Sequence, residues 1–67
     1  MALAQRWATA LEGALRHIGA HPQTGITRYA VQLKLDDLRL WPVDGFPYLV
    51  FYIEREQHIA LVALQEG

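Results

Sequence analysis

The two residues whose spacing most invites chemistry are His17 and His21, four positions apart in an apolar-periodic segment. On a helix this spacing places both imidazoles on one face, where they could hold one metal ion. A useful zinc site needs at least three ligands, and the chain has no cysteine to complete the set. We therefore expect no metal, a capping role for His21 at the end of a helix, and a surface position for His58.

The remaining candidates for catalysis are two adjacent carboxylates, Asp36 and Asp37, and three threonines, Thr9, Thr24 and Thr27. A general acid and base must converge on one substrate, whereas neighbouring side chains of an extended chain point to opposite sides. Serine and cysteine are absent, the threonines lack an evident base, and the five glycines are scattered rather than gathered in a phosphate loop. We predict no catalytic residue and no cofactor, so the protein is not expected to be an enzyme, and we interpret the aspartates as a solvated turn.

The length of 67 residues allows a single domain, residues 1–67, and a chain of this size buries only about 60% of its unfolded surface. With no cysteine there is no disulfide to strengthen it, so a partner or self-association is the expected source of further stability. Charged residues interrupt every apolar stretch well before about 18 residues, and residues 1–15 lack the pattern of a secretion signal. We expect a soluble cytoplasmic protein with no membrane contact.

Charge argues against direct nucleic-acid binding. Six Lys plus Arg face seven Asp plus Glu, and the net charge of -1 offers no general attraction to phosphates.

Residues 2–20 carry the periodicity of an amphipathic helix. Its apolar stripe consists of Leu3, Trp7, Leu11, Ala14, Leu15 and Ile18. The helix is predicted to stop near His21, because Pro22 restricts the residue before it and Gly25 is free to turn.

Alternating apolar residues over positions 29–35 predict a half-buried strand, with a short turn as the alternative. Residues 38–43 form the next extended run, and Asp44-Gly45 is a strong hairpin signal. Residues 48–53 are apolar throughout, which predicts a central strand covered on both faces. After a polar turn at 54–57, residues 58–64 predict the final strand. The result is an α+β fold, an N-terminal amphipathic helix packed on a three- to four-stranded antiparallel sheet.

The densest feature is an aromatic cluster, Trp41, Phe46, Tyr48, Phe51 and Tyr52. Much of it is expected to be core. Because adjacent strand residues face opposite ways, one of Phe51 and Tyr52 must leave the helix-covered face and need another cover. An apolar helix of a partner would suit.

The stretch at 39–52, Arg-Leu-Trp-Pro-Val-Asp-Gly-Phe-Pro-Tyr-Leu-Val-Phe-Tyr, resembles the strand-turn-strand signature of RelE/ParE toxins. Residues 21–25 (His-Pro-Gln-Thr-Gly), followed by Arg28-Tyr29-Ala30, look like the second helix and exit loop of that family. The resemblance implies helices over a twisted antiparallel sheet and a cognate antitoxin as partner in a type II toxin–antitoxin system. It also implies growth inhibition, through DNA gyrase for ParE-like members or through messenger RNA cleavage on the ribosome for RelE-like members.

Two departures from the family pattern shape the expectation. The family's first strand and first helix have no counterpart here, so an edge of the sheet should lie open and favour a homo-oligomer. Near the end, Ala63 stands where the family has an arginine and Gln65 where it has a histidine. Nuclease members need cations to stabilise charge on the scissile phosphate, so we expect no nuclease activity. The missing basic tail puts gyrase inhibition in doubt and favours a truncated or inactive toxin.

We therefore predict a ParE-like toxin or remnant that binds an antitoxin, with partner-binding residues Arg39, Trp41, Tyr48 and Tyr52. A first alternative is a RelE-like ribosome-dependent ribonuclease using Arg28, Lys34, Arg39 and Arg55. A second is a homo-oligomer without toxin activity.

Overall fold

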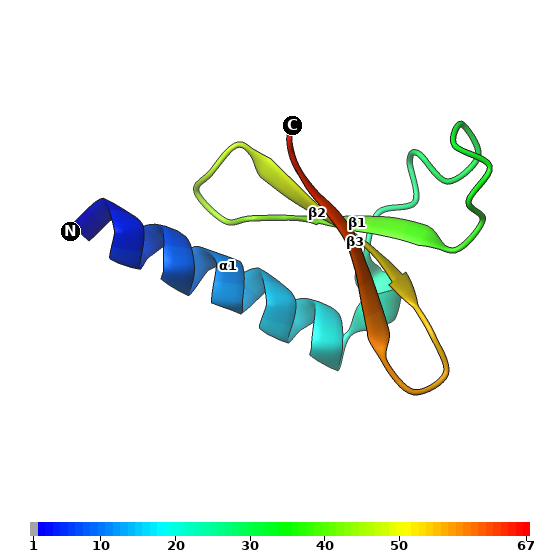
Figure 1. The fold of residues 1–67 in the computed structure, drawn as a ribbon, viewed down its shortest axis with the longest axis horizontal. Helices are drawn as coiled ribbons and strands as arrows, with labels where there is room; N and C mark the ends of the chain where they lie inside the picture. Colours follow the sequence, from blue (N-terminus) through cyan, green and yellow to red (C-terminus); the bar gives the residue numbers. More distant parts are fainter. Residues whose placement is uncertain (1) are drawn as a thin grey trace.

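The computed structural model describes residues 2–67, in which one long helix lies along one face of a three-stranded sheet (Figure 1). The helix is α1 (Ala2–Ala20), and a short 3-10 turn, η1 (Pro22–Thr24), follows it. The strands are β1 (Leu38–Pro42), β2 (Tyr48–Glu54) and β3 (Ile59–Glu66). This arrangement confirms the predicted α+β fold of a helix packed on an antiparallel sheet.

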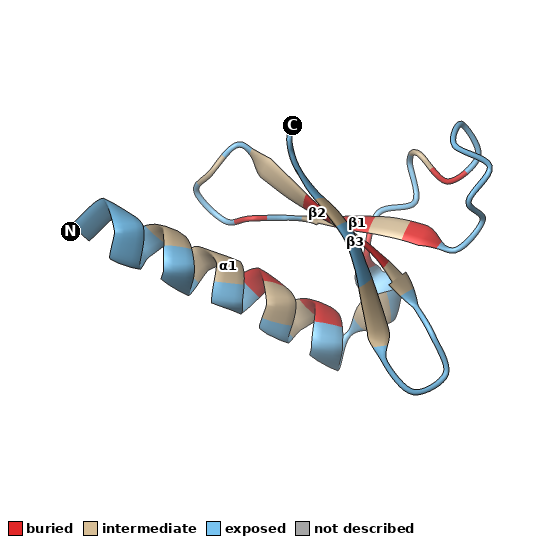
Figure 2. Ribbon diagram, viewed as in Figure 1, coloured by how far each residue is buried: buried red, intermediate tan, exposed pale blue. Residues whose placement is uncertain are grey.

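Helix α1 follows its apolar stripe, but only its second half meets the sheet closely. Ala14 and Ile18 are buried, whereas the N-terminal part is exposed and Leu3 retains 62% of its accessible surface (Figure 2). Trp7 bridges the two regions, with its ring 5.1 Å from Phe46 and 5.3 Å from Tyr48, both edge to face. The first turn of the helix therefore extends past the body of the sheet.

The sheet has the strand order β1-β2-β3, with both neighbouring pairs antiparallel, so β2 is the central strand as predicted. Asp44 and Gly45 form the turn between β1 and β2, and Gly45 adopts a φ of 80°, a left-handed conformation that glycine accepts without strain. The second turn is closed by a bond from the amide of Arg55 to the carbonyl of His58, 2.9 Å apart. The two predicted hairpins are therefore both present.

The strand predicted at residues 29–35 is wrong, and the alternative of a turn is confirmed, because residues 28–34 fold into consecutive turns. The amide of Ala30 bonds to the carbonyl of Thr27 at 3.0 Å and the amide of Leu33 to that of Tyr29 at 3.0 Å, so backbone groups pair locally. Burial also inverts the expected pattern: Ala30 is 5% exposed and Val31 84% exposed. A fourth strand could not have joined at β1, whose outer edge is already bonded to Ile26.

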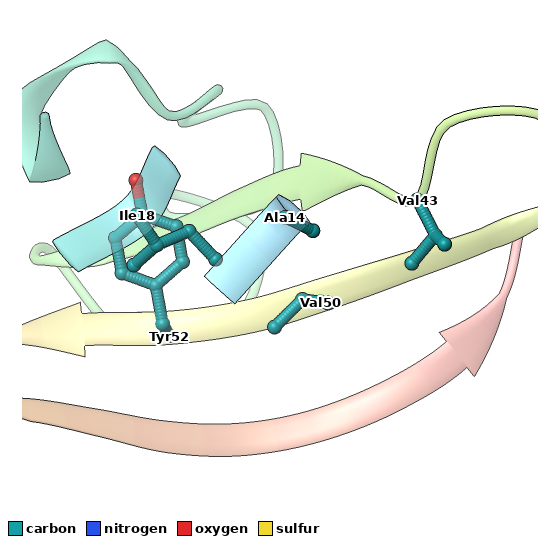
Figure 3. Packing of buried hydrophobic residues seen from close by; sticks show 5 residues of the cluster. All are labelled: Ala14, Ile18, Val43, Val50 and Tyr52. Atoms are coloured by element: carbon teal, nitrogen blue, oxygen red, sulfur yellow. The ribbon is translucent and has the colours of Figure 1, made fainter. Parts of the chain in front are cut away.

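The core lies between α1 and the sheet. Its buried members are Ala14 and Ile18 of α1 together with Val43, Val50 and Tyr52, and Figure 3 shows Tyr52 reaching from β2 towards Ile18. Residues directly opposite in an antiparallel pair share a face, which identifies the helix-facing side of every strand from the register.

The other face of the sheet is covered unevenly. Leu38 and Leu40 point away from α1, since they lie opposite Ile53 and Phe51, and both are buried. The turns at residues 27–37 supply their cover near β1. The prediction that β2 is covered on both faces therefore holds for the α1 side, whereas Leu49 and Phe51 on the other side are only half-buried.

Candidate functional site

The residues predicted to bind a partner, Arg39, Trp41, Tyr48 and Tyr52, are brought together on the helix-facing side of the sheet. Arg39 lies opposite Tyr52 and Trp41 opposite Val50, which fixes their common face. Arg39, Trp41 and Tyr48 are half-buried, and Tyr52 has no exposed surface. Tyr52, although predicted to bind a partner, is therefore a core residue with no surface to offer one.

Tyr52 and Arg39 together tie the sheet to the loop that follows α1. The hydroxyl of Tyr52 donates to the carbonyl of Pro22 at 2.7 Å, and Nη1 of Arg39 donates to the carbonyl of Gly25 at 2.9 Å. Burial raises the pKa of Tyr52 above its usual value, and the positive charge of Arg39 offsets part of that rise. Tyr52 is thus held as a neutral hydrogen-bond donor, a structural role.

His17, His21 and Thr24, which were considered for chemistry, instead contact one another at the end of α1. We call this group the clamp. The ring of His17 stacks on Trp41 with centroids 3.8 Å apart and planes at 14°. Thr24 Oγ1 donates its one proton to the carbonyl of His21 at 2.8 Å, so Nε2 of His17, 2.7 Å from Thr24 Oγ1, must be the donor in that pair. Trp41 is therefore engaged inside the chain rather than presented to a partner.

The predicted solvated turn at Asp36 and Asp37 is confirmed, since both residues are exposed in a turn. Oδ2 of Asp37 lies 3.9 Å from Nη1 of Arg55, and both side chains are well exposed, so this contact contributes little to stability. His58 is also at the surface, as expected.

An apolar hollow of about 460 Å³ opens on the face of the sheet turned away from α1. Phe51 and Leu49 of β2 form its floor, Val62 and Ala63 of β3 one wall, and Leu33 with Leu35 the other. Tyr29 also lines it, with its ring centroid 6.0 Å from that of Phe51. The prediction that one of Phe51 and Tyr52 leaves the helix-covered face is confirmed, and the residue that leaves is Phe51.

The walls of this hollow retain much exposed apolar surface. Leu33 is 56% exposed, and Leu35 and Val62 are exposed as well. Gln65 and Glu66 add polar groups to the lining. Apolar surface gathered in a concavity with a few polar groups is typical of a site that binds another molecule. The sequence reasoning missed these wall residues, because it assigned Leu33 and Leu35 to a strand.

The two edges of the sheet differ. On the outer side of β1, Leu40 exchanges bonds of 2.9 and 2.8 Å with Ile26, and the amide of Leu38 bonds to the carbonyl of Leu35. Strand β3 is the last strand on the other side, and within residues 2–67 no segment pairs with its outer edge. The expected open edge is therefore that of β3.

Comparison with known proteins found no relative: no family model, curated protein or solved structure matches this chain. Among residues 2–67 no three side chains of His, Asp and Glu gather as metal ligands, and no helix there is long and apolar enough to cross a membrane. The geometry of the hollow and of the β3 edge is therefore the basis for a functional proposal.

Proposed function

We propose that this chain is a cytoplasmic ParE-like toxin component of a type II toxin–antitoxin system, and that it acts by binding a cognate antitoxin. The observation that carries the proposal is the apolar hollow beside Phe51, which leaves the sheet face unfinished. The resemblance of residues 39–52 to the toxin signature supports it. In agreement with that resemblance, these residues form a hairpin in the sheet that packs on α1.

Binding would proceed by burial of apolar side chains from the antitoxin against Phe51 and the two walls. Each Å² of apolar surface removed from water contributes about 25 cal/mol, and aromatic side chains in the centre of an interface commonly dominate the affinity. Phe51 fits that role, because it is the aromatic floor of the hollow and is still half-exposed. Glu66 among the lining residues favours a basic or amide side chain on the antitoxin segment beside it.

The alternative of a RelE-like ribonuclease is less well supported. Cations that stabilise a phosphate must converge on one point. Arg39 instead donates to the carbonyl of Gly25 on the α1 side of the sheet. Arg55 lies beside Asp37, in the turn between β2 and β3. Ala63, at the position where the resemblance calls for an arginine, lines the hollow. Protein binding is the function that these positions favour, with gyrase inhibition as the downstream activity to be tested.

Co-expression with the products of the reading frames that flank this gene, among which we expect the cognate antitoxin, followed by affinity capture, tests the proposal. Wild-type protein should retain the antitoxin, and Leu33→Asp should weaken the complex by about tenfold or more, because a charge would be buried in the hollow. Leu3→Asp is the matched control, since Leu3 is equally apolar and is 62% exposed on α1, outside the hollow. Absence of a complex, or equal binding by Leu33→Asp, would contradict the proposal.

Two activity assays separate the targets. Inhibition of gyrase supercoiling by the purified chain would support the ParE-like assignment. Ribosome-dependent messenger RNA cleavage that is lost in Arg39→Ala would instead favour the ribonuclease.

A further inference from the structure

Strand β3 is an unusually unprotected edge. Every residue from 59 to 64 is apolar, so this part of the strand carries neither the charges nor the proline with which edge strands normally resist pairing, and the charge of β3 is confined to Glu66 at its end. Leu61 is 58% exposed and Leu64 46% exposed, both on the α1 side of the sheet, since they lie opposite Tyr52 and Val50. Val62 is exposed on the other side, where it lines the hollow.

The backbone groups available on that edge follow from the ladder with β2. Two bonds mark its ends, from the amide of Gly67 to the carbonyl of Pro47 and from the amide of Arg55 to the carbonyl of His58. Along an antiparallel strand, every second residue forms its backbone hydrogen bonds with the neighbouring strand. The register between β2 and β3 shifts by one residue at Val62, which is a β-bulge. The residues whose amide and carbonyl groups point outward are therefore Ile59, Leu61, Leu64 and Glu66.

These four residues are self-complementary. In a two-fold antiparallel pairing of β3 with a second β3, Leu61 can lie opposite Leu64 of the other copy, and Ile59 then lies opposite Glu66. Every outward residue meets an outward residue in this register. Placing Leu61 opposite itself, or Leu64 opposite itself, sets an outward residue against one bonded to β2. The two-fold axis therefore passes between Val62 and Ala63.

Side chains favour the same register. On the α1 side, the exposed leucines at 61 and 64 of one copy meet those at 64 and 61 of the other, which removes their apolar surface from water. On the other side, the two copies of Val62 lie beside the axis.

We propose that two copies of this chain form a symmetric dimer by antiparallel pairing of β3, with Leu61 opposite Leu64 of the second copy, so that the two sheets become one continuous sheet. This inference is independent of the toxin proposal. The hollow lies on the sheet face beside Phe51, whereas the pairing uses the strand edge.

Sedimentation equilibrium of the full chain tests the association. Wild-type protein should dimerise, and Leu64→Pro should weaken dimerisation on the order of a hundredfold, because the substitution removes an outward amide twice in a symmetric interface. Leu3→Lys, on α1, should dimerise like wild type. The proposal would be overturned if the wild-type chain stayed monomeric up to about 100 times the protein concentration of the urea-unfolding experiments. An unchanged dimer in Leu64→Pro would overturn it as well.

Disulfide capture tests the register without depending on the folding of the proline variant. The chain has no cysteine of its own, so Leu61→Cys and Leu64→Cys can be made singly and mixed. Directly bonded antiparallel residues have Cα atoms about 5.5 Å apart, within disulfide reach. Mild oxidation should cross-link the mixture at least about tenfold faster than either variant alone. Equal cross-linking by Leu61→Cys alone, or none in the mixture, would overturn the register.

Discussion

The hydroxyl of Tyr52 donates a hydrogen bond to the carbonyl of Pro22, 30 residues earlier in the chain and 2.7 Å away. This contact joins the middle of the central strand to the turn that ends α1. Tyr52 has no exposed surface, so the bond is formed away from water and holds the helix at a defined place on the sheet (Figure 3).

Removing this hydroxyl should destabilise the fold. In Tyr52→Phe the carbonyl of Pro22 loses its partner, and we expect the free energy of unfolding to fall by about 1–3 kcal/mol. Urea unfolding followed by circular dichroism measures it. Tyr29→Phe is the control, because the ring of Tyr29 packs near Phe51 in the hollow and its hydroxyl makes no hydrogen bond within residues 2–67. This variant should change the free energy of unfolding by less than about 0.5 kcal/mol. Equal stability of the wild type and Tyr52→Phe would contradict the structural role.

Stability should also depend on pH through Tyr52. The pKa of this hydroxyl is raised in the folded state, so its contribution is fully present below the ordinary tyrosine pKa of about 10 and is lost as the pH rises through the folded value. We expect the urea midpoint to fall above about pH 10. The fall should be shallower for Tyr52→Phe, because this variant lacks the group whose raised pKa makes the wild-type chain release a proton on unfolding at high pH.

The wild type and Tyr52→Phe should differ in how far the urea midpoint falls at high pH. In wild type, the unfolded chain ionises Tyr52 before the folded chain does, which favours unfolding as the pH rises. Tyr52→Phe lacks this group, so it also lacks the pH-dependent loss of stability that position 52 causes. The urea midpoint of the variant should therefore fall less than that of the wild type. The smaller fall in the variant is the prediction, and a fall of equal size in both proteins would contradict it.

Two glycines should respond oppositely to alanine. A Cβ at Gly25 would overlap the hydroxyl of Tyr52, so Gly25→Ala should lower the free energy of unfolding by about 1–3 kcal/mol. Adding Tyr52→Phe should recover part of the loss by removing the oxygen. At Gly13, in the exposed helix, nothing lies within 4 Å of the added atom, and Gly13→Ala should stabilise by about 1 kcal/mol. Thermal unfolding of the variants measures both, and a neutral Gly25→Ala would count against the close packing.

The clamp between His17 and Thr24 should show energetic coupling. His17→Ala removes the stack on Trp41 and the bond to Thr24, and should destabilise by about 1–2 kcal/mol. A double-mutant cycle with Thr24→Val should give a coupling of at least about 0.5 kcal/mol. His21→Ala, at an exposed position, is the control. Additive effects of the two substitutions would show that the bond contributes nothing.

The sequence predicts the helix and the two hairpins because their signals are local. The stripe ending at Ile18 has helical spacing, and Asp44-Gly45 fits only a tight turn. The strand predicted at 29–35 failed because alternation alone does not show whether an edge is free, and Ile26 already occupies that of β1.

The site was harder to predict. Period-two reasoning indicates that Phe51 and Tyr52 face opposite ways but not which of them meets the helix. That choice depends on Gly25 and Pro22, more than 25 residues away, against which only the Tyr52 side fits. The bulge at Val62, which sets the outward residues of β3, has no marker in an unbroken apolar run.

The most direct measurement of the central claim is an amide chemical-shift map of the isotope-labelled chain titrated with the cognate antitoxin that we propose as its partner. We predict that the largest changes fall on Leu33, Phe51 and Val62 around the hollow, while Ala4 and Thr9 on the exposed side of α1 stay unchanged. Changes confined to α1, with the amides around Phe51 unaffected, would contradict a partner-binding function for the open face of the sheet.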